Sequence, residues 1–200
     1  RGLGGVVLGC GMGSPDFKWF SEVYCREVHD ADRYQELNEN FPHTITENIQ
    51  TRYNLRGPSL TVHTACASSG QSIGEAFEIL KSGDADFIIT GGADSMINPF
   101  HMAGFCLLGA LSKRNEDPST ASRPFDAERD GFVLGEGACI LVLETLEHAQ
   151  ARGANILAEL CGYGCTESAY RITDLHPEGT GPIEAMQMAI DDAELKPTEV

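Results

Sequence analysis

Short apolar runs alternate with amphipathic stretches along this chain, and this alternation limits the fold more than any other feature. The runs are rich in β-branched residues, which is typical of strands buried on both faces of a sheet. We predict strands at residues 5–8, 60–62, 87–90 and 139–143. Glycines fall at the ends of these runs and mark the turns between elements. Strand and helix patterns in alternation predict a layered α/β fold.

Two helices are predicted from apolar residues spaced three and four positions apart. The first covers residues 68–81 and ends at Ser82 and Gly83, a plausible C-cap. The second covers residues 182–195 and opens on Pro182. Residues 26–56 are more polar, and we expect helix in parts of them. The side chains expected to point inward are Ile73, Ala76, Phe77 and Leu80 in the first helix and Ile183, Met186, Ala189 and Ile190 in the second.

Composition excludes several classes of function. The formal net charge is −16, so the phosphate backbone of a nucleic acid would be repelled. No apolar run is long enough to span a bilayer, and the first residues do not resemble a signal peptide. The seven cysteines show no paired spacing, which predicts free thiols in a reducing compartment, the cytoplasm. Cys161 and Cys165 are predicted to be buried as small hydrophobes and not to bind zinc. Because the chain begins almost directly on a predicted strand, we expect it to be a fragment of a longer protein.

The segment SLTVHTACASSGQSIGEAF places Cys66 where a strand turns directly into a helix. The positive end of a helix macrodipole stabilises a thiolate, which is the reactive form of cysteine. Residues 65–70 other than Cys66 are small, so the turn is predicted to be tight and open to a substrate. This is the pattern of a nucleophile elbow, in which backbone N–H groups form half of an oxyanion hole. A buried structural cysteine is the alternative, and it is the more common role when a cysteine is taken alone.

The rest of the sequence favours the nucleophile. TACASS is followed by GDADFIITGGADS, GALSKRN and SRPFDAERDGFVLGEGACILVLETLEHAQARGA, and this order resembles the elongating β-ketoacyl-acyl-carrier-protein synthases. The resemblance implies a thiolase-like layered αβαβα fold that lacks its first strand and helix and most of its C-terminal half. It assigns residues 1–153 to the N-terminal half, which carries the nucleophile, and residues 154–200 to the start of the C-terminal half.

The resemblance also implies an activity. Cys66 takes an acyl chain from the phosphopantetheine of acyl carrier protein, and a decarboxylative Claisen condensation with malonyl-carrier protein then extends it, in fatty-acid or polyketide synthesis. No metal or cofactor is implied. The family's two catalytic histidines belong to its second half, so this chain alone is expected to lack decarboxylation chemistry. The histidines that match neither position are His29, His43, His63, His101, His148 and His176.

Three substrate-binding residues are implied by their places in the family's pattern. Phe105 matches an aromatic residue that lines the acyl pocket, and Met12 falls near the far end of that pocket. Thr173, or Asp174 beside it, is expected near the pantetheine entrance. The strand that leads to Cys66, residues 60–64, is expected to pair with its copy in a homodimer.

Two polar features leave alternatives open. Gly109 stands where some relatives carry a basic residue that docks the carrier protein, so Lys113 and Arg114 are candidates for docking, or equally a solvated loop. Residues 112–131 form a long polar loop, which suggests either an acid–base cluster or a scaffold braced by internal ion pairs. We favour the scaffold. The charged residues in question are Arg123, Asp126, Arg129, Asp130 and Glu136.

Three other functions are weighed against the synthase. A non-catalytic partner subunit of a polyketide synthase usually lacks the nucleophilic cysteine, so Cys66 argues against it. A cysteine-dependent thioester hydrolase would not need the blocks that follow Cys66. Degradative thiolases share the fold, but the residues around their cysteine differ from TACASS.

Overall fold

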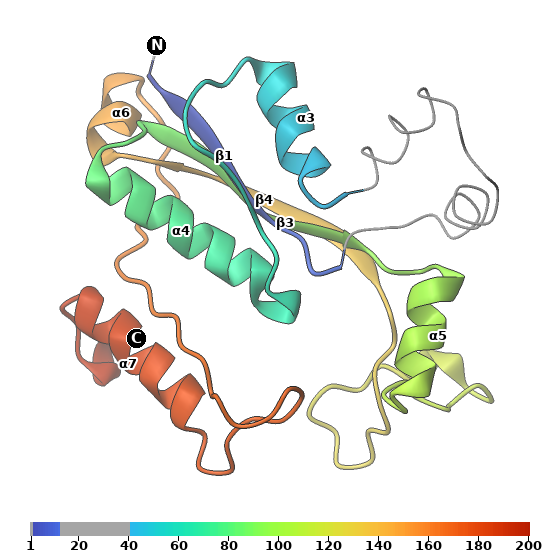
Figure 1. Ribbon diagram of the computed structural model, residues 1–200. Coiled ribbons are helices and arrows are strands. Elements are labelled where there is room, and N and C mark those ends of the chain that lie inside the picture. Colours follow the sequence, from blue (N-terminus) through green and yellow to red (C-terminus); the bar gives the residue numbers. More distant parts are fainter. Residues whose placement is uncertain (1, 13–40) are drawn as a thin grey trace, which may run out of the picture.

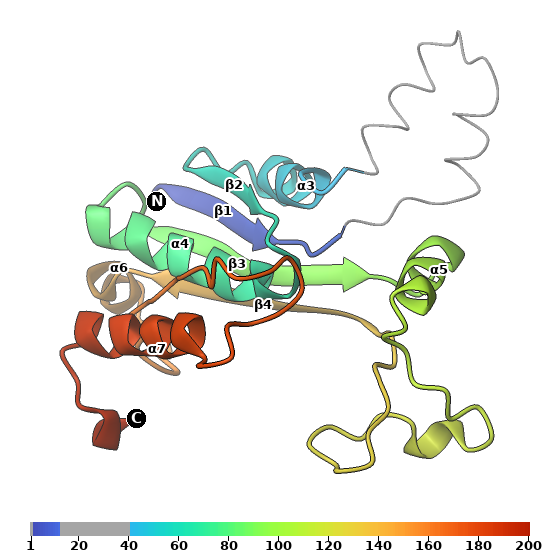
Figure 2. The ribbon, with the colours of Figure 1, turned by 60° about the horizontal axis from the view of Figure 1, so that its bottom comes forward.

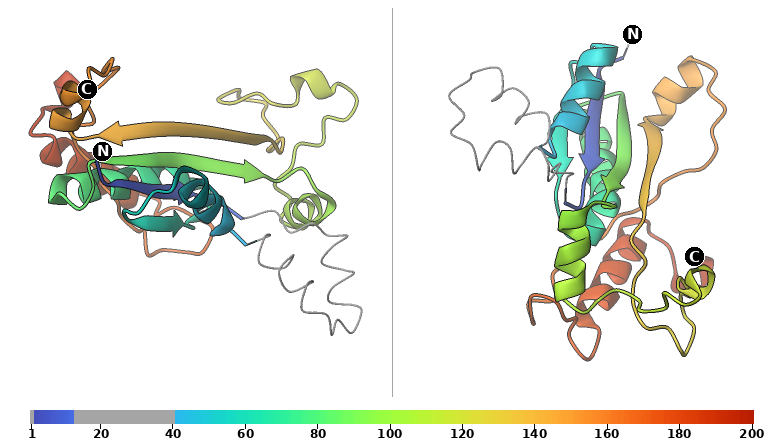
Figure 3. Two further views of the ribbon diagram at one scale, coloured as in Figure 1. Left: turned by 90° about the horizontal axis from the view of Figure 1, so that it is seen from above. Right: turned by 90° about the vertical axis from the view of Figure 1, so that its right-hand side faces the viewer.

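The structure is a computed structural model that describes residues 2–12 and 41–200. Its centre is one mixed sheet in the order β2-β1-β3-β4. β1 runs parallel to β2 and β3, and β4 is antiparallel to β3. Figure 3 shows the long β4 at one edge of the sheet and the short β2 at the other. The strands are β1 (Gly4–Gly9), β2 (Ser59–Val62), β3 (Phe87–Ser95) and β4 (Glu136–Glu144).

Helices lie on both faces of this sheet, which confirms the predicted layered α/β fold. In Figure 1 α3 lies on one side of the sheet, and α4 and α7 lie on the other. The predicted helix in residues 26–56 is confirmed for α3, while residues 26–40, Cys25 and His29 lie outside the described residues. The helices are α3 (Thr44–Tyr53), α4 (Ser68–Ser82), α5 (Pro99–Leu107), α6 (Leu146–Ala151) and α7 (Thr180–Asp192), with 3₁₀ turns at Ala65–Ala67, Pro118–Thr120 and Pro197–Glu199.

The core is small and lies between α4 and the sheet. Val7, Ala76, Ala85 and Ile88 are buried together there. Burying a side chain such as Val7 or Ile88 stabilises the fold by about 1.5–3 kcal/mol. The predicted C-cap of α4 is confirmed, because Gly83 has the left-handed conformation (φ 81°).

Of the predicted inward residues of α4, Ala76 is fully buried as expected, whereas Ile73 and Phe77 are only partly buried. Ser68 and Ser72 are buried although they were not predicted to be. Ser68, Ser72 and Ala76 are spaced by four, so they form one row that faces the sheet. Large apolar residues dominate a sequence pattern, but small ones make the closest helix–sheet contact.

The predicted burial of other elements also needs correction. Of the predicted inward residues of α7, Ile183 and Met186 are exposed, because α7 packs through Ala185 and Ala189 on the backbone of residues 162–164. β1 is buried along its whole length, but most residues of β4 are exposed, since little in the described ranges covers them. Burial on both faces was therefore correctly predicted for β1 and wrongly predicted for β4.

An ion-pair cluster joins the end of β4 to α6. The carboxylate of Glu144 accepts hydrogen bonds from Nε of Arg152 (2.7 Å) and from Nη2 of the same residue, and it contacts Nδ1 of His148 (2.7 Å). The hydrogen bonds from Arg152, followed by the one from His148, lower the pKa of Glu144 to about 2 against the opposing effect of burial. The His148 ring also stacks on Phe87, so His148 has a packing role.

This cluster predicts acid-sensitive stability. A carboxyl whose pKa falls on folding, here from 4.5 to about 2, stabilises the fold above pH 4.5 and loses that contribution as the pH falls toward 2. Arg152→Gln is expected to raise the pKa of Glu144 and to flatten the dependence of melting temperature on pH between 2 and 5. Arg171→Gln, which removes an exposed ion pair with Asp174, should leave the dependence unchanged. Equal flattening in both variants would contradict this assignment.

A second prediction concerns the contact between β3 and β4. Gly91 has φ +124°, and a Cβ there would lie 2.1 Å from the carbonyl oxygen of Cys139. Gly91→Ala is therefore expected to destabilise the protein by about 3 kcal/mol, measured by thermal unfolding of the protein that carries this chain. Gly137→Ala is the control, because a Cβ on Gly137 would have no neighbour within 4 Å, and the expected change is within about 0.5 kcal/mol. Similar melting temperatures for the two variants would refute the steric argument.

Candidate active site

Cys66 lies in a tight turn between β2 and α4, as the sequence predicts. The turn is the 3₁₀ segment Ala65–Ala67, and α4 begins directly afterwards at Ser68. Ala65 has φ +50°, a conformation that is costly for a residue with a Cβ, so the backbone is strained just before the thiol. Cys66 is a free and exposed cysteine, which excludes the buried structural role for it within this chain.

Glycines bring this turn close to the sheet. A Cβ on Gly9 would lie 2.3 Å from the carbonyl carbon of Ser68, and one on Gly92 would lie 1.9 Å from Oγ of Ser69. Gly9 ends β1 and Gly92 lies in β3 beside it. The N-terminal end of α4 therefore sits directly on the backbone of both strands, and Cys66 is held at their carboxyl ends.

Two side chains that the sequence reasoning missed secure the surroundings. Ser68 is buried, and its Oγ accepts a hydrogen bond from the Thr64 N–H (2.9 Å) and donates one to the Ala65 carbonyl (2.7 Å). Asp94 accepts hydrogen bonds from the N–H groups of Gly11 (2.8 Å) and Met12 (3.3 Å). Asp94 thus holds the chain where it leaves β1. The spacing of four between Ser68 and Ser72 was the only signal for Ser68, and nothing in the sequence marked Asp94.

The predicted substrate-binding residues lie on three separate segments. Phe105 is half-buried in α5, which Figure 2 shows beyond the carboxyl end of β3, and it packs edge-to-face on Phe132 (6.4 Å between ring centres). The Met12 side chain is exposed just after β1, and Thr173 is exposed between α6 and α7. Within the described ranges, none of these side chains forms a hydrogen bond with Cys66, so their part in a pocket stays a prediction.

The segment before α7 is fastened to α4 and to the end of α7. Nε2 of Gln71 donates to Sγ of Cys165 (3.0 Å), and the Tyr163 N–H donates to Asp192 (3.0 Å). Burial, aided by contacts with Cys165, raises the pKa of Tyr163 above its ordinary range. Cys161 and Cys165 are both exposed, so their predicted burial was wrong: this segment meets α4 and α7 largely through glycine and tyrosine.

The other predicted histidines have local structural contacts. Nδ1 of His63 donates to the Cys10 carbonyl (2.6 Å), which ties the end of β2 to the end of β1. His101 is buried and hydrogen-bonds with Asn98, the N-cap of α5. These contacts give both histidines local structural roles.

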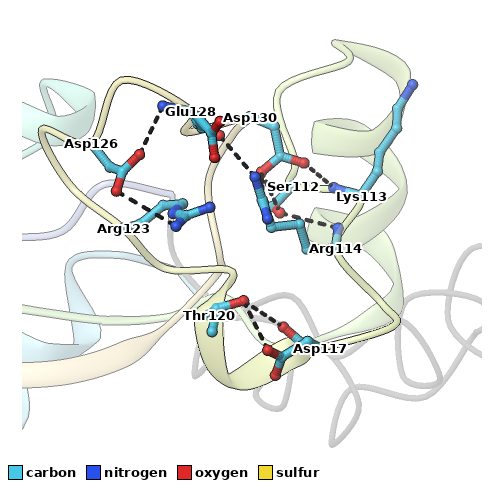
Figure 4. Close-up of polar contacts among 9 residues, drawn as sticks. All are labelled: Ser112, Lys113, Arg114, Asp117, Thr120, Arg123, Asp126, Glu128 and Asp130. Carbon is cyan, nitrogen blue, oxygen red and sulfur yellow. Dashed lines mark hydrogen bonds and ion pairs between the residues drawn. The ribbon is translucent and has the colours of Figure 1, made fainter.

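The polar loop is braced internally, as the scaffold interpretation predicts (Figure 4). Asp130 accepts hydrogen bonds from the Ser112 hydroxyl (2.7 Å) and the Lys113 N–H (2.9 Å), and the Ser112 bond is the main reason that its pKa lies below the usual range. Arg114 pairs with Asp130 (3.7 Å), and its guanidinium donates to the Glu128 carbonyl (3.1 Å).

Three further members of the suspected cluster do not meet at one point. Arg123 pairs with Asp126 (3.5 Å) within the loop, while Glu136 accepts a hydrogen bond from Ser95 (2.6 Å) on β3. In the described part of the chain, no group of three or more His, Cys, Asp or Glu side chains is placed to hold a metal ion. None of the helices in residues 2–12 and 41–200 has the length and apolar content that crossing a bilayer requires.

Comparison with known proteins gives consistent matches. The family model "Beta-ketoacyl synthase, N-terminal domain" matches residues 3–149. A 3-oxoacyl-[acyl-carrier-protein] synthase 2 of Staphylococcus aureus is 52% identical over 159 residues, covering 80% of this chain and 39% of the relative. A putative polyketide beta-ketoacyl synthase 1 of Streptomyces cyaneus is 46% identical over 200 residues, covering 99% of this chain and 47% of the relative. The chain therefore spans less than half the length of these relatives.

A solved structure is similar over nearly the whole chain. It is a ketosynthase of a type II polyketide synthase, bound to a hexaketide and in complex with its acyl-carrier protein. The TM-score is 0.87 at 30% sequence identity, with 99% of this chain and 50% of the other covered. This likeness confirms the thiolase-like layered α/β fold that was expected from the sequence.

The loop contacts predict a change in protease sensitivity. Asp130→Ala removes the acceptors of Ser112 and of the Lys113 N–H, so trypsin is expected to cleave after Lys113 and Arg114 several-fold faster. Asp117→Ala is the matched control, since the side-chain hydrogen bonds of its carboxylate in the described residues go to Ser119 and Thr120 in its own turn. Cleavage rates that do not differ between these variants would show that Asp130 does not brace the loop.

Proposed function

Because the chain belongs to the β-ketoacyl synthase family, we propose that Cys66 takes an acyl chain from a carrier protein and holds it as a thioester. The observation that supports this most is the position of Cys66, a free and exposed thiol at the N-terminal end of a 15-residue helix. A helix macrodipole favours negative charge at that end. Alanine and serine on either side leave a substrate room to approach.

The proposed reaction is an acyl transfer followed by a condensation. The Cys66 sulfur attacks the carbonyl carbon of the acyl group on the carrier protein's phosphopantetheine. A new C–S bond forms, the bond to pantetheine breaks, and the pantetheine thiol leaves with the proton that Cys66 gives up. Malonyl-carrier protein then loses CO₂, and its carbanion displaces the Cys66 thiolate to give a β-ketoacyl-carrier protein. The activity is that of an acyltransferase.

We assign only the acyl transfer to residues of this chain. His63, His101 and His148 each have a packing or hydrogen-bonding partner that accounts for them. The two histidines that assist decarboxylation are placed in the half of the family's domain that this chain does not match. The proposal needs no metal and no cofactor beyond the pantetheine of the substrates.

The pocket and the pathway follow from the family pattern. Phe105 and Met12 are proposed to line the acyl pocket, and Thr173 to lie near the pantetheine entrance. Fatty-acid and polyketide elongation both remain in the proposal, because relatives named for each match the chain. A non-catalytic partner subunit is the alternative, and the presence of Cys66 disfavours it.

Acyl carrier protein and a second copy of this chain are the proposed partners. Lys113 is exposed while Arg114 is committed to Asp130, so Lys113 is the better candidate for docking an acidic carrier protein. Among the described residues β2 is an edge strand that pairs with β1, and Leu60 on it is 45% exposed, which suits pairing with its copy. We also propose that the protein is cytoplasmic. Residues 1–153 are assigned to the N-terminal half of the synthase domain, and residues 154–200 to the start of its C-terminal half.

The test is mass spectrometry of the protein that carries this chain after incubation with an acyl-carrier-protein thioester. We expect a mass gain equal to the acyl group, its absence in Cys66→Ala, and its retention in Cys165→Ala, which removes another exposed thiol. No gain in the unaltered protein, or a gain that survives in Cys66→Ala, would reject the acyl-carrying role and favour the partner-subunit alternative.

A further inference from the structure

Ser68 ties the first residue of α4 to the backbone that leads into Cys66. Its side chain is 2% exposed. Its Oγ accepts a hydrogen bond from the Thr64 N–H (2.9 Å) and donates to the Ala65 carbonyl (2.7 Å), with the Cys10 carbonyl farther away (3.3 Å). The Ser68 N–H also donates to the Ala65 carbonyl. One buried residue therefore supplies two donors to the same carbonyl.

The Ala65 carbonyl and the Cys66 N–H belong to one peptide unit. A trans peptide is planar, so its C=O and N–H point in opposite directions. Because Ser68 holds the C=O, the Cys66 N–H points away from the buried Ser68 side chain. Within the described ranges this N–H has no hydrogen-bond partner.

This peptide needs to be held. Ala65 has φ +50°, so the backbone is strained at the residue that carries this carbonyl. The hydrogen bond from the Ser68 hydroxyl to the Ala65 carbonyl opposes rotation of the 65–66 peptide. Without it, only the Ser68 N–H would remain on the Ala65 carbonyl.

We propose that Ser68 is a positioning residue whose hydroxyl orients the 65–66 peptide so that the Cys66 N–H meets the developing oxyanion of an acyl thioester. The inference rests on the proposed function, since it concerns acyl transfer to Cys66. It separates two properties of the site: the reactivity of the thiol, and the stabilisation of negative charge on the substrate oxygen.

Ser72 provides a matched control in the same helix. It is also fully buried, and its hydroxyl also donates to backbone carbonyls, those of Gly91 (2.5 Å) and Ser69 (2.8 Å). These contacts fasten α4 to β3 and do not involve the peptide before Cys66. Ser72→Ala therefore removes a comparable buried hydroxyl without releasing that peptide.

The experiment compares two reactions at Cys66 in the protein that carries this chain. Acyl transfer from an acyl-carrier-protein thioester passes through an oxyanion, whereas alkylation by iodoacetamide attacks a saturated carbon and does not. Removing one oxyanion-hole donor typically slows a reaction about 10²–10³-fold. Because Ser68→Ala misorients the donor and does not remove it, we expect acyl transfer to fall about tenfold or more, with alkylation within about twofold.

Ser72→Ala is expected to leave the ratio of the two rates unchanged. If Ser68→Ala does not fold, the comparison uses Ser68→Thr and Ser68→Val, whose side chains have the same shape and differ in the hydroxyl. The Thr variant should show the higher ratio of acyl transfer to alkylation. A Ser68 variant that slows both reactions equally, or neither, overturns the proposal. If the unaltered protein takes no acyl group on Cys66, the proposed function fails and this inference falls with it.

Discussion

The contact between the first residues of α4 and the carboxyl ends of β1 and β3 is the interaction on which the candidate site depends. It exists because Gly9 and Gly92 have no side chains and because Ser68 and Ser69 are small. The backbones meet so closely that a Cβ on either glycine would overlap α4. Five residues, 63–67, join β2 to α4, and the last three form the 3₁₀ turn of which Cys66 is the middle residue.

The other end of α4 is held by weaker polar contacts. Lys81 pairs with Asp192 of α7 (2.8 Å), and Asp192 also accepts the Tyr163 N–H. Lys81 is about half-exposed, and an exposed ion pair contributes at most about 1 kcal/mol. These contacts therefore set the direction of α7 relative to α4, while the stability of the layer comes from the core around Val7 and Ile88.

Much of the fold was predictable because its elements are strongly patterned. The β-branched runs became β1 to β4, and the helix from Ser68 ended at Gly83 as expected. The direction of burial was less predictable. Ile183 and Met186 are exposed although the pattern placed them inside, because α7 uses alanines to approach a glycine-containing backbone. Hydrophobic periodicity reports which residues are large, and close packing here is made by residues that are small.

The sequence by itself determined the four strands, the helices α4 and α7, the family and the one cysteine placed at a strand-to-helix turn, because these are properties of local pattern and motif order. Only the tertiary structure decided that Ser68 holds the Ala65 carbonyl and that Asp94 holds the N–H groups after β1. Ser68 and Ala65 are only three positions apart, and their contact depends on the packing of Ser68 against the end of β1. For Asp94 the physical reason is distance along the chain. Asp94 and Gly11 are 83 positions apart, and the parallel pairing of β1 with β3 is what brings their carboxyl ends together.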